Sequence, residues 1–423
     1  MRQKFTAFPG MEDILPGEVE RWQWLEQRAR IFFESRGFRE IRTPLLEPAE
    51  LFARSIGEAT DIVHKEMYSF EDRGGRKMSL RPEMTASVAR AVIEKGLLKT
   101  AKSLRLYYLG PMFRAERPQA GRKRQFHQIG IEMINEAGLE ADVEVIRLLY
   151  DFLKYTGVAE PLVQLNDLGN AQNRPKLAED LRHYFDREKS KLCPDCHWRL
   201  EKNVFRIFDC KVESCQPVIQ SAPWDEVHPL GEDFEKLTQM LNGQKIPFTV
   251  KRRLVRGLDY YDGVVFEAVS RSLGAQDAVA GGGRYNQLYA ELGGQKTPCT
   301  GFSIGMERLL TVLENEMEPL SEKIRKRRVY LAPLDASDEI LDIFRKKALE
   351  LRELGIRTET LPGEFSLSRH LKRANQWNIR YVLMLGPDEI KKSKCTVKDL
   401  DEKQQFEIGL DELSSTMERV LRT

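Results

Sequence analysis

Residues 125–133 have the sequence Gln-Phe-His-Gln-Ile-Gly-Ile-Glu-Met, in which apolar and polar positions alternate. Because the side chains of a β-strand point alternately to its two faces, this alternation predicts a strand with two different sides. One face would carry apolar side chains and belong to the core: Ile129, Ile131 and Met133. The other would carry an amide, a gap and a carboxylate in a row: Gln128, Gly130 and Glu132. That second face is either solvent-exposed or, if buried, requires polar partners for its groups.

The strand is the second half of a predicted antiparallel hairpin between Leu104 and Asn135, in which two extended runs flank a charged loop over 115–124. Hydrophobic spacing indicates further elements of the same domain: an amphipathic helix over 17–36, strands over 38–42, 264–269 and 302–304, and a helix over 306–313. This order predicts an α+β domain on a mostly antiparallel sheet. Within it, Gly281-Gly282-Gly283 is interpreted as a tight turn and not as a phosphate-binding loop.

The hydrophobic period changes after the basic stretch that ends at Arg328, and strands then alternate with helices. The expected elements are a strand over 329–331, a helix over 338–354, a strand over 356–361, a helix over 366–376 and a strand over 380–385. Such an alternation predicts a small α/β domain. We place the boundary near Arg325, which gives domains over 1–325 and 326–423. A third unit, over 167–224, interrupts the first domain and contains four of the six cysteines.

The length of 423 residues exceeds what one hydrophobic core usually supports, which agrees with two or three domains. No apolar run approaches the roughly 20 residues that span a bilayer. The basic N-terminus is not followed by the apolar stretch of a secretory signal. We therefore expect a cytoplasmic protein with no membrane partner. The formal net charge of +2 does not bear on nucleic-acid binding, which depends on how charge is distributed.

Four cysteines of the 167–224 unit have CxxC and CxxxxC spacing: Cys193, Cys196, Cys210 and Cys215. This spacing is compatible with a four-thiolate zinc site, with His197 as a spare ligand. Disulfides are disfavoured in a cytosolic protein, so the alternative is a set of reduced, partly buried thiols. The spacing does not decide between the two, and no metal is assigned.

Two segments bring an arginine to the end of a predicted strand. Residues 110–117, Gly-Pro-Met-Phe-Arg-Ala-Glu-Arg, place Arg114 beside the polar face of the hairpin, where an anion is its natural partner. Residues 301–310, Gly-Phe-Ser-Ile-Gly-Met-Glu-Arg-Leu-Leu, form a glycine-bearing strand-to-helix turn with Arg308 in the first turn of the helix. Close backbone approach and a forked cation suit a polyphosphate. Alone, this second pattern also fits an ordinary connection with a surface arginine.

Together these segments resemble motifs 2 and 3 of the class II aminoacyl-tRNA synthetases, and residues 37–48 resemble motif 1, whose proline lies at the dimer interface. The resemblance implies the class II catalytic domain, a homodimer, and ATP used as a substrate together with Mg²⁺. It also implies that Arg114 binds the α-phosphate of ATP as a catalytic residue and that Arg308 binds the far end of the triphosphate.

Residues 254–261, Leu-Val-Arg-Gly-Leu-Asp-Tyr-Tyr, and 280–286, Ala-Gly-Gly-Gly-Arg-Tyr-Asn, resemble two signatures peculiar to the histidyl-tRNA synthetase family. By that resemblance the substrates are histidine, ATP and tRNA(His). Arg256 would lie near the α-phosphate and the histidine carboxylate as a catalytic, ATP-binding residue. The implied histidine-binding residues are Glu132 and Tyr261 for the ring nitrogens, Glu83, Thr85 and Gln128 for the ammonium group, and Tyr285. From its own sequence context, Glu83 is also interpretable as a capping or surface carboxylate.

The resemblance extends to RNA contacts. It directs the hairpin loop, with Arg117 and Gln119, toward the acceptor end of tRNA, and it identifies 167–224 as the family's insertion domain. The last hundred residues resemble the class IIa anticodon-binding domain, although no anticodon-contacting side chain can be named. The alternative from another functional class is a synthetase-like regulatory subunit of ATP phosphoribosyltransferase, which normally lacks that C-terminal domain.

Overall fold

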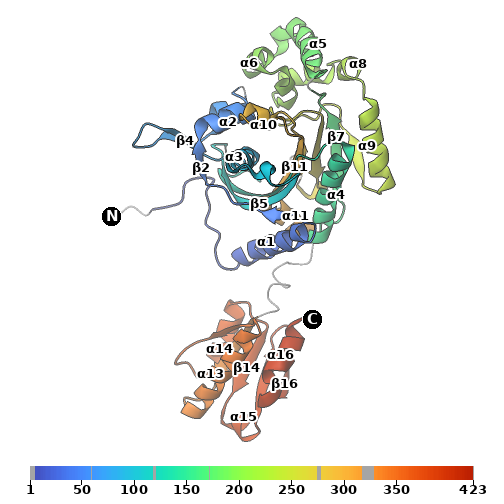
Figure 1. The fold of residues 1–423 in the computed structure, drawn as a ribbon. Helices are drawn as coiled ribbons and strands as arrows, with labels where there is room; N and C mark the ends of the chain where they lie inside the picture. The colour runs from blue at the N-terminus through green and yellow to red at the C-terminus, as the bar shows by residue number, and fades with distance from the viewer. Residues whose placement is uncertain are drawn as a thin grey trace. The chain divides into compact units, whose positions relative to one another are not determined.

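The computed structural model describes residues 5–422 except 59, 118–120, 171, 274–277 and 317–327. The chain divides into two compact units, Met1–Met317 and Glu318–Thr423 (Figure 1). The boundary expected near Arg325 lies outside the described residues. Among the described helices, none combines the length and the apolar character needed to cross a membrane.

In the described part of the first unit, an eight-stranded sheet has the order β1-β5-β6-β11-β10-β9-β7-β8. The pairs at its two edges, β1 with β5 and β7 with β8, are parallel, and all pairs between them are antiparallel. The strands are β1 (Arg39–Glu40), β5 (Leu104–Phe113), β6 (Gln125–Ile134), β7 (Leu162–Asp167), β8 (Phe248–Val250), β9 (Val264–Val269), β10 (Ala278–Arg284) and β11 (Cys299–Gly305). The predicted hairpin is β5 and β6, and the mostly antiparallel α+β sheet is confirmed.

Helices cover both faces of this sheet. One face packs on the helices α1 (Val19–Glu34), α4 (Leu139–Thr156), α9 (Glu232–Gly243) and α11 (Met306–Glu316), and it carries the apolar side chains of β6. The opposite face packs on α3 (Thr85–Lys95), so that α1 and α3 lie on different sides of the strands in Figure 1. The face of β6 that carries Gln128, Gly130 and Glu132 is therefore buried, not solvent-exposed.

Smaller elements surround α3. The described residues include a three-stranded sheet of order β2-β4-β3, with β2 (Leu46–Pro48), β3 (Ser69–Glu71) and β4 (Lys77–Leu80). Short helical elements near it are α2 (Ala49–Ile56), η1 (Ile62–Glu66), η2 (Leu97–Lys99) and α10 (Leu288–Glu291), while η6 (Arg271–Leu273) precedes β10. The unit over 167–224 is helical: α5 (Arg174–Arg187), η3 (Lys189–Lys191), α6 (Pro194–Lys202), η4 (Val204–Asp209), η5 (Glu213–Cys215), α7 (Gln216–Gln220) and α8 (Trp224–Val227).

The described residues of the second unit form a five-stranded sheet of order β13-β12-β14-β15-β16. Its strands are β12 (Arg328–Pro333), β13 (Arg357–Thr360), β14 (Tyr381–Leu385), β15 (Lys394–Asp399) and β16 (Gln404–Gly409), and its helices are α13 (Asp338–Glu353), α14 (Leu367–Gln376), α15 (Pro387–Lys391), η7 (Leu410–Glu412) and α16 (Leu413–Arg422). The first three strands are parallel and the last two add antiparallel to them. The predicted α/β domain is thus confirmed, and β15, β16 and α16 extend it.

The interpretation of Gly281-Gly282-Gly283 as a tight turn is wrong, because all three residues lie within β10. Glycine is required there because neighbouring groups approach the strand closely. A Cβ at Gly282 would overlap the carbonyl oxygen of Gly301 on β11. A Cβ at Gly281 would overlap the guanidinium group of Arg256. The glycines therefore allow tight strand packing and leave room for an arginine above the sheet.

We expect Gly282→Ala to lower the free energy of unfolding of the first unit by at least about 2 kcal/mol, because the obstructing atom belongs to the backbone and cannot move aside cheaply. The matched control is Gly243→Ala at the end of α9, where no atom lies within contact distance of the added methyl group. Chemical unfolding followed by circular dichroism measures both changes. Equal stability of the two variants would contradict this account of the glycine run.

Candidate active site

The Glu132 carboxylate lies on the buried polar face of the sheet and is only 2% exposed. It accepts hydrogen bonds from the hydroxyl of Thr85 at 2.8 Å and from the hydroxyl of Tyr285. Opposite it, a Cβ at Gly301 would overlap one of its oxygens. Burial raises the pKa of Glu132 to about 8, although both hydroxyl groups act in the lowering direction. The group is therefore mostly protonated at neutral pH.

Glu83 precedes α3 and caps it. Its two carboxylate oxygens accept the backbone N–H groups of Thr85 at 2.7 Å and of Ala86 at 2.9 Å, so the capping interpretation from the sequence holds. The side chain is also 3% exposed, and burial raises its pKa. Because the backbone of Thr85 bonds to Glu83 and its hydroxyl to Glu132, this threonine links the two carboxylates in one site.

Tyrosine rings line the same region. Tyr261 and Tyr285 are both buried, with ring centroids 6.4 Å apart, and Tyr260 lies against both, at 4.7 Å and 5.6 Å respectively. Burial raises the pKa of Tyr261 to about 12, so its hydroxyl keeps its proton at neutral pH. Tyr108 was not expected from the sequence: its ring fills the space that a side chain at Gly130 would occupy. In the sequence, Gly130 in the middle of the polar row was the feature that could have indicated a bulky neighbour at this position.

Gln128 is a polar side chain of this site whose hydrogen bonding is incomplete. Its Nε2 donates to the hydroxyl of Ser303 at 3.4 Å. Its Oε1 is buried and has no hydrogen-bond partner among the described residues, while the whole residue is 9% exposed. An unpaired buried acceptor is unfavourable unless a ligand supplies the missing donor. Gln128 and the two carboxylates are therefore suited to a ligand that carries N–H groups and positive charge.

Arg256 belongs to the segment that connects β8 to β9 along the chain. Its guanidinium group lies over Gly281 of β10. Its Nη1 forms an ion pair with the Glu267 carboxylate of β9, and its carbonyl oxygen accepts a hydrogen bond from Arg206 at 2.9 Å. Burial opposes the charged form, but the Glu267 carboxylate outweighs it and raises the pKa of Arg256. Its Nε is buried with no partner in the described part of the chain. A fixed cation with a free donor is suited to an anionic ligand.

Arg114 and Arg308 are held mainly by backbone carbonyl groups. Arg114 donates from Nε to the carbonyl of Pro82 at 3.0 Å, and its guanidinium lies 5.2 Å from the ring centroid of Phe126. Arg308 donates to the carbonyls of Gly121 at 3.0 Å and Ala278 at 2.6 Å. Burial lowers the pKa of Arg308, and repulsion from nearby cations, including Arg256, adds to this effect. Neighbouring cations such as Arg256 and Arg308 are typical of a polyphosphate site.

The hairpin loop is described only in part. Arg117 is exposed, whereas Gln119 lies outside the described residues. Neighbouring basic side chains pair within the chain, Arg122 with Glu116 at 3.2 Å and Lys123 with Glu12 at 2.6 Å. The RNA role of this loop stays a prediction.

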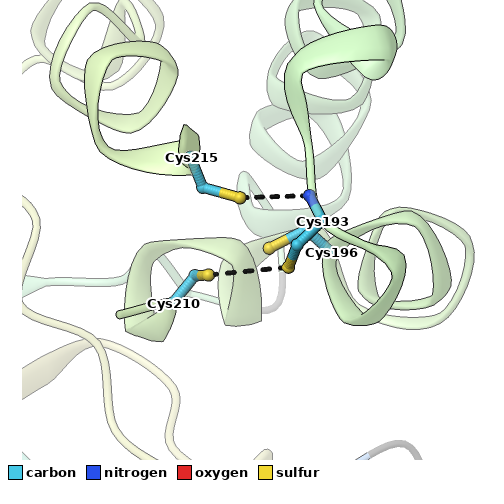
Figure 2. A group of neighbouring side chains, drawn as sticks. All are labelled: Cys193, Cys196, Cys210 and Cys215. Carbon is cyan, nitrogen blue, oxygen red and sulfur yellow. Dashed lines mark hydrogen bonds between the residues drawn. The ribbon is translucent and has the colours of Figure 1, made fainter. Parts of the chain in front are cut away.

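The four cysteines of the helical unit converge (Figure 2), since their sulfur atoms all lie within 4.8 Å of one another. Cys193 is partly buried, and Cys196, Cys210 and Cys215 are buried. His197 does not join them. Its Nε2 and the carbonyl oxygen of Lys189, 2.7 Å apart, form an exposed hydrogen bond. The expectation of a spare histidine ligand is therefore wrong, because this imidazole is engaged with the backbone.

The chain is similar to known proteins over almost its whole length. The family model described as histidyl-tRNA synthetase matches residues 10–189 and 215–309, and an anticodon-binding domain model matches residues 328–419. A histidine–tRNA ligase from Anaeromyxobacter sp. (strain K) is 42% identical over 415 residues, which cover 97% of this chain and 99% of that protein. One from Synechococcus sp. (strain CC9902) is 43% identical, with 99% of each chain covered.

Solved structures agree. The crystal structure of apo S. aureus histidyl-tRNA synthetase has a TM-score of 0.77 and 29% identity, covering 98% of this chain and 100% of that one. A chain from Bacillus halodurans, titled an ATP phosphoribosyltransferase regulatory subunit/histidyl-tRNA synthetase, shares the fold with a TM-score of 0.66 but only 23% identity. The regulatory-subunit alternative is therefore the less supported one. The matched family model, the near-full-length relatives and the separate anticodon-binding unit show that this chain belongs to the histidyl-tRNA synthetase family, whose members are aminoacyl-tRNA ligases.

Proposed function

We propose that the buried polar face of the large sheet binds histidine and ATP and joins them as histidyl-adenylate, with pyrophosphate released. The histidyl group is then transferred to the 3′ end of tRNA(His). The observation that carries this proposal is a pair of buried carboxylates and an unpaired glutamine oxygen in the same unit as three arginines held by protein oxygens. Such a site matches a cationic amino acid and a polyphosphate.

Histidine recognition divides into two parts. Glu83 and the unpaired Oε1 of Gln128 would accept hydrogen bonds from the ammonium group, with Thr85 beside them. Each oxygen of Glu83 already accepts one backbone N–H group, but a carboxylate oxygen can accept a second hydrogen bond. The capping role and the binding role are therefore compatible.

The imidazole would bind between Glu132 and Tyr261, one for each ring nitrogen. Tyr285 would act by orienting Glu132, to which its hydroxyl donates. A site that pairs both ring nitrogens rejects an isostere that lacks them, because the buried groups of the protein would then be unpaired. Tyr261 is buried and keeps its hydroxyl proton, so it can donate as well as accept.

ATP would lie along the arginines, with Arg114 and Arg256 at the α-phosphate and Arg308 at the far end of the triphosphate. An oxygen of the histidine carboxylate attacks the α-phosphorus, the bond to the bridging oxygen breaks, and the electron pair leaves on pyrophosphate. Such a displacement requires positioning and charge stabilisation rather than covalent help from the protein. Mg²⁺ bound to the phosphates would supply the additional positive charge.

We expect Arg256→Ala to lower histidine-dependent ATP–pyrophosphate exchange by about 10²–10³-fold, the usual effect of removing one group that stabilises developing charge. The matched control is Arg54→Ala, which removes an exposed arginine from an i,i+4 ion pair with Glu50 on α2. Circular dichroism checks that both variants are folded. An exchange rate within about threefold of the parent protein for Arg256→Ala would refute its catalytic role.

Glu132 also makes the stability of the folded protein depend on pH. Its folded-state pKa of about 8 lies above the ordinary 4.5, so the folded protein binds this proton more tightly than the unfolded chain does. Stability from this group is therefore present at low pH and is lost as pH rises toward 8. Relative to Glu132→Gln, which does not titrate, the parent protein should lose at most about 4 kcal/mol between pH 5 and 8.

Urea unfolding of both proteins across that pH range measures the difference. Glu235→Gln on α9, an exposed position, is the control for the removal of a carboxylate outside the site. A Glu132→Gln curve parallel to the parent curve would mean that Glu132 is ionised throughout and that its pKa is not raised.

We further propose that the protein is a cytoplasmic homodimer that binds tRNA(His) through the anticodon-binding unit and the hairpin loop, with Arg117 and Gln119 facing the acceptor end. For dimerisation, support comes from the small sheet, whose strand β2 lies within the motif-1 segment. The sheet exposes apolar side chains at Leu46 and Phe70, and Leu45, just before β2, is exposed as well. Exposed apolar groups gathered on one element are typical of a protein interface.

The double substitution Leu46→Glu/Phe70→Glu should convert the dimer into a monomer, because two buried carboxylates per subunit would lack partners. Light scattering coupled to size-exclusion chromatography measures the mass. Leu349→Glu is the control, since this leucine is exposed on α13 of the second unit and should leave the mass unchanged. A dimer that persists in the double variant would contradict the placement of the interface.

A further inference from the structure

The four-cysteine cluster is defined as Cys193, Cys196, Cys210 and Cys215. It joins three turns of the helical unit: Cys193 is the N-cap of α6 and Cys196 lies in its first turn, Cys210 ends η4, and Cys215 ends η5. Figure 2 shows the four side chains pointing toward one another from these separate elements. None of the four cysteines is among the residues assigned to histidine or ATP binding.

The distances fit a tetrahedral thiolate site. With metal–sulfur bonds of about 2.3 Å, the sulfur atoms of such a site lie roughly 3.8 Å apart. The sulfur atoms of Cys193 and Cys210 are 3.8 Å apart, and no pair in the cluster exceeds 4.8 Å. Small rotations of the side chains would bring all four to a common centre. All four are free thiols.

Hydrogen bonds around the sulfur atoms favour thiolates. The backbone N–H of Cys193 donates to the sulfur of Cys215 at 3.1 Å, and that of Val212 donates to the sulfur of Cys210 at 3.4 Å. Donors directed at the ligand atoms orient them and offset their negative charge, as in structural metal sites. Arg199 follows Cys196 by one helical turn on α6 and places a cation on the same side of the helix.

Three of the four cysteines lie between the two ranges that the family model matches. The family model matches residues 10–189 and resumes at 215, so the segment it leaves out contains Cys193, Cys196 and Cys210. None of the four has a role in the binding of histidine or ATP proposed above. The competing explanation, four reduced thiols that serve as ordinary core side chains, accounts for their burial but not for their convergence on one point.

We propose that the four-cysteine cluster binds one Zn²⁺ ion through four thiolates and thereby fixes α6, η4 and η5 as a rigid support. Sites with four thiolate ligands hold zinc or iron. Zinc is the choice here because histidine activation and transfer involve no electron transfer, and a closed four-thiolate zinc site is structural. Each thiol releases its proton to solvent when the metal binds.

The elements so fixed touch the loop that carries Arg256. Arg206 of η4 donates to the carbonyl of Arg256 at 2.9 Å, and Asn203, between α6 and η4, donates to Asp259 at 2.7 Å. Arg199 of α6 pairs with Asp61 of the catalytic domain. A metal that holds α6 and η4 together would therefore help to keep the loop that carries Arg256 in place.

Metal analysis of the full-length chain tests the proposal directly. The protein is produced in medium supplemented with zinc, without a histidine tag, and purified without chelator. We expect about one zinc ion per chain by mass spectrometry, with the thiols of the cluster unreactive toward a thiol reagent until the metal is removed. Less than about 0.2 zinc per chain, or iron in its place, overturns the proposal.

A substitution pair identifies the ligands. The variant Cys193→Ser/Cys210→Ser should lose the zinc, and its thermal unfolding midpoint should fall by at least about 4 °C. Cys299→Ser changes a buried free cysteine on β11, outside the cluster, and should keep the zinc. Zinc retained in the double variant overturns the assignment.

If the double variant does not fold, Co²⁺ added to metal-free parent protein replaces that test. The visible and charge-transfer bands of tetrahedral thiolate-bound cobalt support the site, and their absence overturns it.

Discussion

A carboxylate buried on the inner face of a sheet must be given hydrogen-bond donors, and this requirement organises the first unit. Glu132 accepts hydrogen bonds from the hydroxyl groups of Thr85 and Tyr285. Thr85 is the first residue of α3, and Tyr285 directly follows β10. For those groups to reach Glu132, the facing strand must lack a side chain at Gly301. The burial that raises the pKa of Glu132 also makes the pocket selective, since any ligand must supply what water no longer can.

The three arginines of the site are positively charged, and they too are positioned by neighbouring protein groups. The guanidinium group of Arg256 lies over Gly281 of β10, where a larger residue would leave no room for it. The carboxylate of Glu267 favours the charged form of Arg256. Backbone carbonyl oxygens accept hydrogen bonds from Arg114 and Arg308 and orient both guanidinium groups. The site therefore combines buried acceptors for a cationic amino acid with oriented cations for a polyphosphate. This combination is the physical basis for the proposed adenylate chemistry.

Local patterns in the sequence predicted the fold better than they predicted contacts. The alternation in 125–133 and the charged loop before it define the β5–β6 hairpin, because strand period and turn composition are local properties. The run Gly281-Gly282-Gly283 was misinterpreted because its cause lies in Gly301 and Arg256, which are distant in sequence. The strand β16 was missed because most of its side chains are exposed and give no apolar alternation.

The candidate site shows the same division. Family resemblance named Glu83, Glu132 and Tyr261, and the structure adds how burial and hydrogen bonding condition them. The unpaired oxygen of Gln128 and the ring of Tyr108 beneath Gly130 depend on three-dimensional packing, which composition and spacing do not encode. The engagement of His197 with a backbone carbonyl is likewise a tertiary contact.

The central claim is that one pocket selects histidine and activates it with ATP. The measurement that tests it most directly is ATP–pyrophosphate exchange with each of the twenty amino acids in turn, at equal concentration. The account predicts exchange that depends on histidine and exceeds that with every other amino acid by at least about 10⁴-fold. No exchange with histidine, or comparable exchange with proline, threonine or glycine, would contradict it.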